Sequence, residues 1–324
     1  MKKISCIGEY GILDWIEERY SVRGKGRLIM GPGDDAALIR ISSGRLLVVS
    51  TDEMVENTHF RETLRHPELI ARKLVRINVS DLAAMGSVRP LSAVAGAGLR
   101  RNMPLDWLKK FMKSLVCECR RFGMTLAGGN LARSEHAHVY MTVFGEAWPG
   151  EIISRSGARP GDLIFGLGPL GDSRAGLEIF LSGRRPAGVE KKLLKRFWLP
   201  RPFIREGAVL GKNRLATALL DNSDGLMAGV SILAGRGKCA ARIRLIPGCV
   251  SKELKSYCRS HKKDWRGYAL AGGEDYGLIF TVRPANAGKL LSLLPSCVEL
   301  GAMENGTGVR AEGCAPGTEK FEHF

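Results

Sequence analysis

The stretch at residues 67–86 reads PELIARKLVRINVSDLAAMG and is typical of an amphipathic helix that ends at a glycine. Its apolar stripe steps by 4, 3, 4 and 4 residues and consists of Ile70, Leu74, Ile77, Asp81 and Met85. A carboxylate on this stripe needs a charged or metal partner, because removal from water otherwise favours its neutral form. The helix therefore predicts either a hard-cation site beside Asp81 or a structural aspartate satisfied by hydrogen bonds.

Strands and helices alternate on both sides of this helix, which is the pattern of an α/β or α+β fold. In the first half we expect strands at 45–50, 91–98 and 138–144, and helices at 67–85 and 105–121. A turn-rich segment at 148–162 then precedes a strand at 163–165 and a helix after Gly171. The sequence predicts two domains, 1–147 and 148–324.

The composition is that of a globular protein, with 44% hydrophobic and 25% charged residues among 324. The net charge of +16 favours anionic partners, of which phosphorylated metabolites, nucleic acids and acidic membranes are examples. Eight cysteines form no C-x-x-C pair, so neither a zinc site nor a disulfide framework is indicated. No apolar stretch has the length of a membrane span, and the segment at 12–16 predicts an amphipathic helix instead of a signal peptide. We expect a cytoplasmic protein.

Two further patterns have ordinary explanations. Residues 166–171 match G-x-G-x-x-G, but Glu190, at the distance of a ribose-binding acid, opens a Lys-rich helical segment instead of ending a strand. We interpret 166–171 as a tight strand-to-helix turn. The basic run at 184–205 predicts a solvated face.

Acidic residues gather in glycine-rich or strand-end segments despite the positive net charge. These segments are 31–37, 50–52, 221–225 and 272–275. Each alone is typical of a turn or a helix cap. Together they offer carboxylate, hydroxyl and amide oxygens, which Mg²⁺ prefers as ligands. Magnesium on a basic protein indicates phosphate chemistry.

The order of these motifs resembles that of the thiamine-monophosphate kinase family. The matching segments are 31–37, 50–52, 78–86, 128–129, 154–162, 171–173, 221–225 and 271–276. The resemblance implies a two-domain fold of the aminoimidazole-ribonucleotide synthetase type and a homodimer in which the N-terminal sheets join into a barrel. It also implies transfer of the γ-phosphoryl group of ATP to thiamine monophosphate, which gives thiamine diphosphate and ADP.

The resemblance also implies roles for particular residues. The implied magnesium ligands are Asp35, Ser50, Thr51, Asp52, Asp81, Asn130, Asp221 and Asp224. The implied nucleotide contacts are Gly128, Gly129, Arg155 and Ser223, and the implied substrate contacts are His59, Glu274 and Phe321. Without the resemblance, His59 is more typical of a solvated loop than of a binding site. Because the acceptor is an ionised phosphate, we expect no general base.

One departure from the family keeps other functions open. Asn130 stands where the family has an aspartate, so a weakened nucleotide-binding relative is one alternative. A sister ATP-dependent synthetase is a second, although Cys6 lacks the glycine-rich setting of the reactive cysteine in selenophosphate synthetases. Nucleic-acid binding rests on net charge alone, without an aromatic-basic motif. We expect neither nucleic acid nor membrane as a partner.

Overall fold

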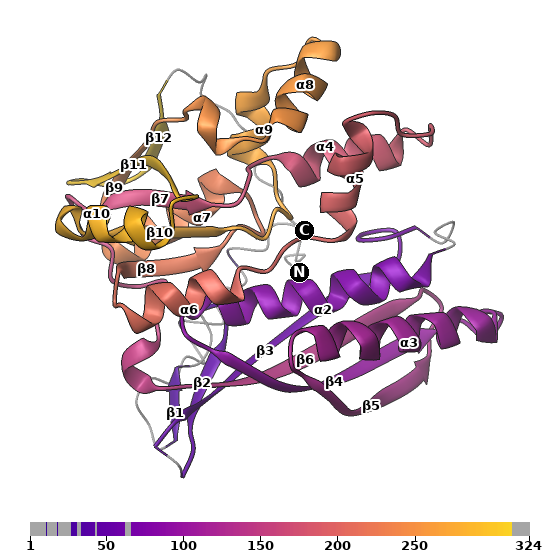
Figure 1. Cartoon of the computed structure of the whole chain (residues 1–324). Helices are drawn as coiled ribbons and strands as arrows, with labels where there is room; N and C mark the ends of the chain where they lie inside the picture. Colours follow the sequence, from indigo (N-terminus) through magenta and orange to yellow (C-terminus); the bar gives the residue numbers. More distant parts are fainter. Residues whose placement is uncertain are drawn as a thin grey trace, which may run out of the picture.

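The computed structural model describes residues 11, 18, 27–30, 34–42, 44–61 and 66–312. These residues form two six-stranded sheets, each with helices packed on it (Figure 1). The helix predicted around 12–16 and Phe321 lie outside the described residues. No helix within the described ranges is both long and apolar enough to span a membrane.

The first sheet is antiparallel except for one pair of strands. Its order is β1 (Leu28–Met30), β2 (Ala37–Arg40), β3 (Leu46–Val55), β6 (His138–Ala147), β4 (Arg89–Leu99) and β5 (Thr125–Arg133), with β4 and β5 parallel. The helices α2 (Pro67–Ala84) and α3 (Leu105–Arg121) lie on one face of this sheet (Figure 1). The strands predicted at 91–98 and 138–144 and the helices predicted at 67–85 and 105–121 are confirmed, and the strand predicted at 45–50 is part of β3.

One expectation about this sheet is wrong. We expected residues 50–52 at the carboxyl end of a strand, but β3 continues to Val55. The reason is its neighbour β6, which pairs with β3 over its whole length and places Thr51 opposite Thr142. The polar residues 50–52 therefore lie in the middle of a strand.

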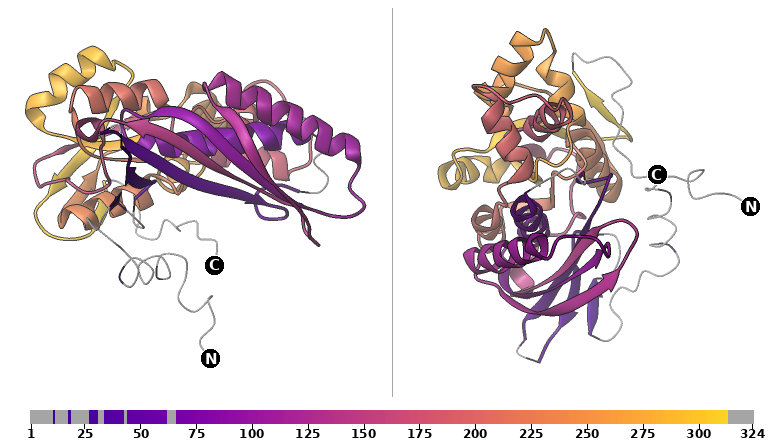
Figure 2. Two further views of the ribbon diagram at one scale, coloured as in Figure 1. Left: turned by 90° about the horizontal axis from the view of Figure 1, so that it is seen from below. Right: turned by 90° about the vertical axis from the view of Figure 1, so that its right-hand side faces the viewer.

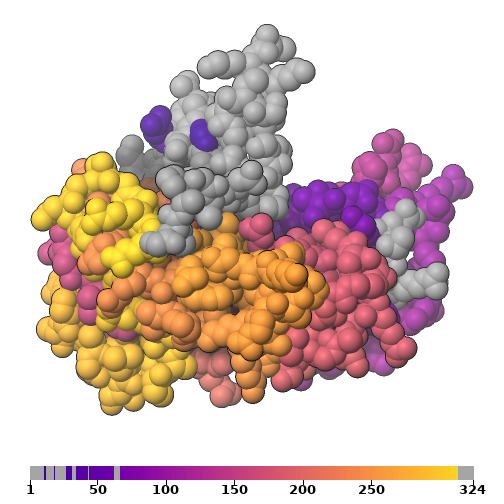
Figure 3. Space-filling model, turned by 90° about the horizontal axis from the view of Figure 1, so that it is seen from above, coloured from indigo at the N-terminus to yellow at the C-terminus, as the bar shows by residue number. Residues whose placement is uncertain are grey.

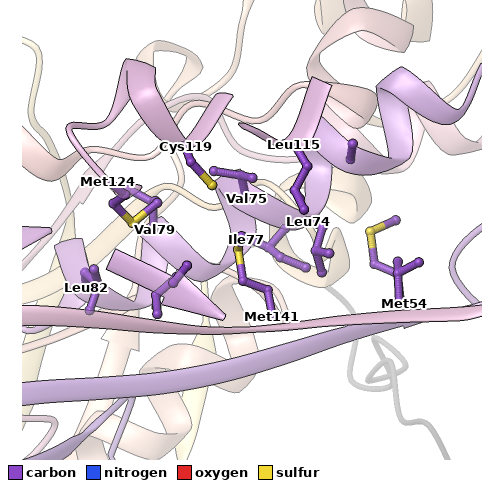
Figure 4. Close-up of a cluster of buried hydrophobic side chains, with 14 of the residues drawn as sticks. Met54, Leu74, Val75, Ile77, Val79, Leu82, Leu115, Cys119, Met124 and Met141 are labelled. Carbon is purple, nitrogen blue, oxygen red and sulfur yellow. The ribbon is translucent and has the colours of Figure 1, made fainter. Parts of the chain in front are cut away.

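The core under α2 includes the apolar members of the predicted stripe and further residues outside it, such as Leu82. Leu74 and Leu82 are fully buried and pack with Leu115 of α3 and Met141 of β6 (Figure 4). The helix ends at Ala84, and Gly86 follows with φ +91°, a conformation that favours glycine. A side chain there would also meet the Glu151 carbonyl oxygen at 2.6 Å. Burial on this scale holds α2 rigidly against the sheet.

The second sheet has the order β12 (Val309–Ala311), β9 (Ala240–Ile243), β11 (Val298–Glu304), β7 (Leu163–Leu167), β10 (Leu278–Val282) and β8 (Ala216–Asp221). Its helices are α4 (Asp172–Leu181), α5 (Glu190–Trp198), α6 (Ile204–Lys212), α7 (Leu226–Gly237), α8 (Lys252–Ser260), α9 (Trp265–Ala271) and α10 (Pro284–Leu293), with short 3₁₀ turns η2 (Pro149–Glu151) and η3 (Pro247–Cys249). Figure 3 shows α8 and α9, in orange, beside the pink segment of α4 and α5.

The turn at 166–171 is confirmed, because β7 ends at Leu167 and α4 begins at Asp172. Both neighbours of β7, β10 and β11, run antiparallel to it, so this turn does not belong to a dinucleotide-binding βαβ unit. The basic run begins in the loop before α5, and Arg184, Lys191 and Lys195 are exposed as predicted.

The two halves share a core at α2 and α6. Ala83 and Ala84 of α2 pack with Phe203, which precedes α6, and with Leu210 of α6. The first sheet ends at Ala147, and the second begins at Leu163. We propose domains 1–147 and 148–324 on this division of the strands. The cavity described below lies along their shared boundary.

Candidate functional site

Acidic side chains from four separate segments meet beside α2. Asp35 precedes β2, Asp52 lies on β3, Asp81 on α2, and Asp221 ends β8. Carboxylate oxygens of Asp35, Asp81 and Asp221 all lie within 4.8 Å of one another. Three carboxylates at this spacing repel strongly, so the cluster is suited to hold a hard cation.

Hydroxyl and amide groups hold these acids in place. Ser50 Oγ donates a hydrogen bond to Asp81, and Ser80 Oγ donates to Asp221 Oδ2 at 2.6 Å. Asn78 Oδ1 accepts a hydrogen bond from the Asp52 backbone N–H at 3.2 Å. Asn78 and Ser80 are buried residues of α2 that the sequence analysis did not place among the site residues. Their position one turn or less from Asp81 is the signal that could have identified them.

The protonation of the acids reflects their crowding. Burial raises the pKa of Asp52 to about 7, and the charge of Asp224 adds to this effect. Burial and the charge of Asp35 raise the pKa of Asp221 to about 7. Burial also raises the pKa of Asp81 well above its usual value, and Asp52 contributes. A bound cation would favour the ionised form of all three, so the donor set fits a divalent metal ion.

Arg155 connects this cluster to the second half of the chain. Its Nε and terminal nitrogen donate to the two carboxylate oxygens of Asp35 at 2.9 and 2.7 Å. Its backbone N–H donates to the Asp34 carboxylate. Burial and the charge of the neighbouring Asp35 raise the pKa of Asp34 to about 7. Arg155 lies at the cavity wall, but its guanidinium binds a protein carboxylate in this structure.

A cavity of about 900 Å³ contains the acidic cluster and extends along α2. Asp81, Ile77 and Lys73 all line it, and they follow one another at intervals of four residues on one helix face. At 1.5 Å per residue, Asp81 and Lys73 are about 12 Å apart along the helix axis. The cavity therefore has an acidic end at Asp81 and a second end near Lys73.

The second end combines apolar side chains with one ion pair. Leu177 of α4 and Phe197 of α5 line the cavity, as do Glu274 and His59. Lys73 Nζ donates to Glu274 Oε1 at 2.9 Å, and Glu274 has φ +60°. His59 Nδ1 accepts a hydrogen bond from the Val55 N–H at 3.0 Å, so its ring is held by the end of β3.

The structure brings most of the residues implied by the resemblance to this one cavity. Its wall includes Asp35, Ser50, Thr51, Asp52, His59, Asp81, Arg155, Asp221, Ser223, Asp224 and Glu274. Lys73 and Arg174 also line it, and the sequence analysis missed both. For Lys73, the shared helix face with Asp81 is the signal that was available.

Gly128, Gly129 and Asn130 are not among the described residues of the cavity wall. They lie on β5, the edge strand, in a row with residues 51–53 of β3: Gly129 pairs with Ala95, Ala95 with Met141, and Met141 with Asp52. Three strand spacings of roughly 4.8 Å separate Gly129 from Asp52, or about 14 Å. Within one copy of the chain, these residues therefore lie apart from the acidic cluster.

Known proteins resemble both the sequence and the fold. Residues 33–147 match the family model described as AIR synthase related protein, N-terminal domain. A thiamine-monophosphate kinase of Aquifex aeolicus is 33% identical over 323 residues, which is 99% of this chain and 100% of the relative. The thiamine-monophosphate kinase of Escherichia coli K12 is 35% identical over 266 residues, 81% of this chain and 78% of the relative.

A solved structure described as AaThiL complexed with AMPPCP and TMP superposes with a TM-score of 0.88 at 31% identity. The match covers 100% of this chain and 99% of that chain. The two-sheet architecture and these likenesses confirm the predicted fold.

Proposed function

The chain belongs to the thiamine-monophosphate kinase family, and we propose that it transfers the γ-phosphoryl group of ATP to thiamine monophosphate, giving thiamine diphosphate and ADP. The observation that carries this proposal is the two-ended cavity along α2. Its acidic end suits metal-bound phosphates, and its second end offers Leu177, Phe197 and the Glu274 carboxylate to a cationic ring.

We assign Mg²⁺ to the acidic end. Asp35, Asp81 and Asp221 supply the central carboxylates, and Ser50, Asp52 and Asp224 supply further oxygens nearby. The Thr51 hydroxyl instead donates to the Met141 carbonyl oxygen at 3.0 Å, so Thr51 has only its backbone oxygen to offer. When bound, magnesium screens the charge of the phosphate groups. The protein holds the two anionic substrates in line and excludes water from between them. No general base is needed, because the attacking oxygen belongs to an ionised phosphate.

Product analysis with ATP, magnesium and a series of acceptors tests this function. We expect thiamine diphosphate from thiamine monophosphate and no phosphorylation of free thiamine, whose hydroxyl requires a base. Absence of thiamine diphosphate at saturating magnesium would reject the proposed substrate. ATP binding without turnover would support the weakened relative, and turnover of a sister acceptor would support the synthetase alternative.

We also propose that the protein is a homodimer that joins its first sheets. Among the described elements, α2 and α3 cover one face of this sheet, and Figure 2 (left) looks onto the other face. On that face the rings of Tyr140 and His138 lie over Gly96 and Gly98, where a Cβ would approach each ring to 2.1 Å. The β5 edge is exposed, with Leu131 61% accessible. A second copy would bury this edge and face.

Light scattering at micromolar protein measures this association. We expect a mass near twice that of one chain, and a lower mass for Leu131→Lys. Leu181→Lys, at another exposed leucine, is the matched control and should leave the mass unchanged. A wild-type mass of one chain would reject the dimer.

We further propose a cytoplasmic location, consistent with the free thiols of the described cysteines.

A further inference from the structure

Lys73 is a fully buried lysine in the wall of the proposed substrate site. We propose that it is a positioning residue that orients the Glu274 carboxylate toward the cationic acceptor and keeps it apart from the acidic cluster. This inference rests on the proposed function, because it concerns how the same cavity binds thiamine monophosphate.

The surroundings of Lys73 leave its ammonium group little freedom. Its side chain is 1% exposed, and Nζ lies 2.9 Å from Glu274 Oε1. The same nitrogen lies 3.9 Å from the ring centroid of Phe197 and 5.5 Å from that of Trp198. A buried charge without a partner is strongly unfavourable, so Lys73 depends on this carboxylate and these aromatic faces.

Glu274 is held from its backbone as well as from its side chain. Its N–H donates to the Ser223 carbonyl oxygen at 2.5 Å, and its own carbonyl oxygen accepts from Ser173 Oγ at 2.7 Å. Its backbone has φ +60°, a conformation uncommon for a side-chain-bearing residue. With the backbone held in this way, the contact with Lys73 sets the direction of the carboxylate.

The ion pair is oriented with its negative end toward the cavity. The Glu274 side chain is 27% exposed, whereas that of Lys73 is 1% exposed. Both residues line the cavity, but a cationic ligand can contact the more exposed Glu274 more readily than Lys73. This geometry favours action of Lys73 through Glu274 over direct contact with the substrate.

Glu274 lines the same cavity as the acidic cluster, so the ion pair with Lys73 determines how its carboxylate is placed there. Asp81 begins the acidic cluster about 12 Å from Lys73 along α2, measured at 1.5 Å per residue. Without Lys73, the Glu274 carboxylate would lose its cation, its fixed direction and its separation from the acidic cluster. A carboxylate that is already oriented binds a cation without an ordering cost.

Lys73→Met tests the proposal, because methionine is unbranched, of similar length and compatible with aromatic neighbours. We expect the KM for thiamine monophosphate to rise about tenfold, as for loss of a charged hydrogen bond, and the KM for ATP to change less than twofold. The matched control is Lys110→Met on α3, whose side chain is 58% exposed. It should leave both constants unchanged.

A double-mutant cycle separates positioning from direct contact. If Lys73 acts through Glu274, Lys73→Met combined with Glu274→Gln should raise the KM for thiamine monophosphate no further than Glu274→Gln alone. Multiplied effects would place Lys73 in direct contact with the substrate and overturn the proposal. An unchanged KM in Lys73→Met would overturn it as well.

Lys73→Arg keeps the positive charge and provides a second test, which covers the case in which the methionine variant does not fold. It should retain a KM for thiamine monophosphate within about threefold of wild type, because a guanidinium can also donate to the carboxylate. A loss of affinity in a folded Lys73→Arg protein, with a normal KM for ATP, would overturn the role of charge. Product formation by the wild-type protein separates this inference from the proposed function. If the wild-type protein makes no thiamine diphosphate, both are rejected. If the wild-type protein is active and the Lys73 variants have the same KM for thiamine monophosphate, only the role of Lys73 is rejected.

Discussion

Asp81→Asn should stabilise the metal-free protein while it abolishes turnover. Asp81, Asp35 and Asp221 place carboxylate oxygens within 4.8 Å of one another. Two unit charges at that distance repel by about 3.5 kcal/mol at an effective dielectric constant near 20, which is an upper bound for each pair. At pH 8 Asp221, with a pKa of about 7, is mostly ionised, whereas the raised pKa of Asp81 reduces the repulsion. Because solvent and residual protonation reduce it, we expect a gain of about 1 to 2 kcal/mol in unfolding free energy, or about 1.5 to 3 °C in Tm for a chain of this length.

Thermal unfolding at pH 8, in a chelator and in excess magnesium, measures this effect. Wild type should gain stability from magnesium, by about 2.7 kcal/mol at a hundred times the dissociation constant, and the variant should gain much less. Asp106→Asn is the control, because Asp106 is exposed on α3 and is not among the described residues that line the cavity. A variant that is less stable in chelator, but still gains stability from magnesium and turns over, would refute the reasoning. Asp81 would then be a structural aspartate satisfied by Ser50.

Four further predictions concern the same site. Asp52→Ala should abolish turnover with an unchanged circular dichroism spectrum, since Asp52 serves charge neutralisation more than packing; near-normal turnover would remove it from the site. Asn130→Asp should lower the magnesium concentration for half-maximal rate by about ten- to a hundredfold if a second copy brings β5 to the cavity; superimposable titration curves would show that Asn130 is not a deficient ligand. The magnesium concentration for half-maximal rate should decrease as the pH rises from 6 to 8, because Asp52 and Asp221, with pKa values of about 7, must lose protons to bind metal. In a chelator the folded protein binds protons at Asp52 and Asp221 more tightly than the unfolded chain does, because their pKa values rise from 3.8 to about 7 on folding. This contribution to stability is complete below pH 3.8 and is lost as the pH rises through about 7, so Tm should fall between pH 5 and pH 8. A flat Tm profile would contradict the pKa shifts.

Local patterns in the sequence determined the elements and the kind of chemistry. The stripe from Ile70 to Met85 predicted α2 and its inward carboxylate, because helical periodicity depends only on residues three or four positions apart. The ordered acidic motifs indicated oxygen ligands and phosphate chemistry for the same reason: each motif is contained in a few consecutive residues. The turn at 166–171 was also readable from its glycines and its flanking segments.

The tertiary structure alone decided which residues meet. Asp221 follows Asp81 by 140 residues and Glu274 follows Lys73 by 201, so their contacts depend on how α2 packs between the two sheets. The length of β3 likewise depends on hydrogen bonds to β6, and the distance of Asn130 from the cluster depends on strand order. Hydrogen bonds between strands and contacts between side chains of distant segments produce no periodic pattern in the sequence of either segment. For that reason the sequence predicted the acids of the site, whereas the contact between Lys73 and Glu274 was visible only in the folded chain.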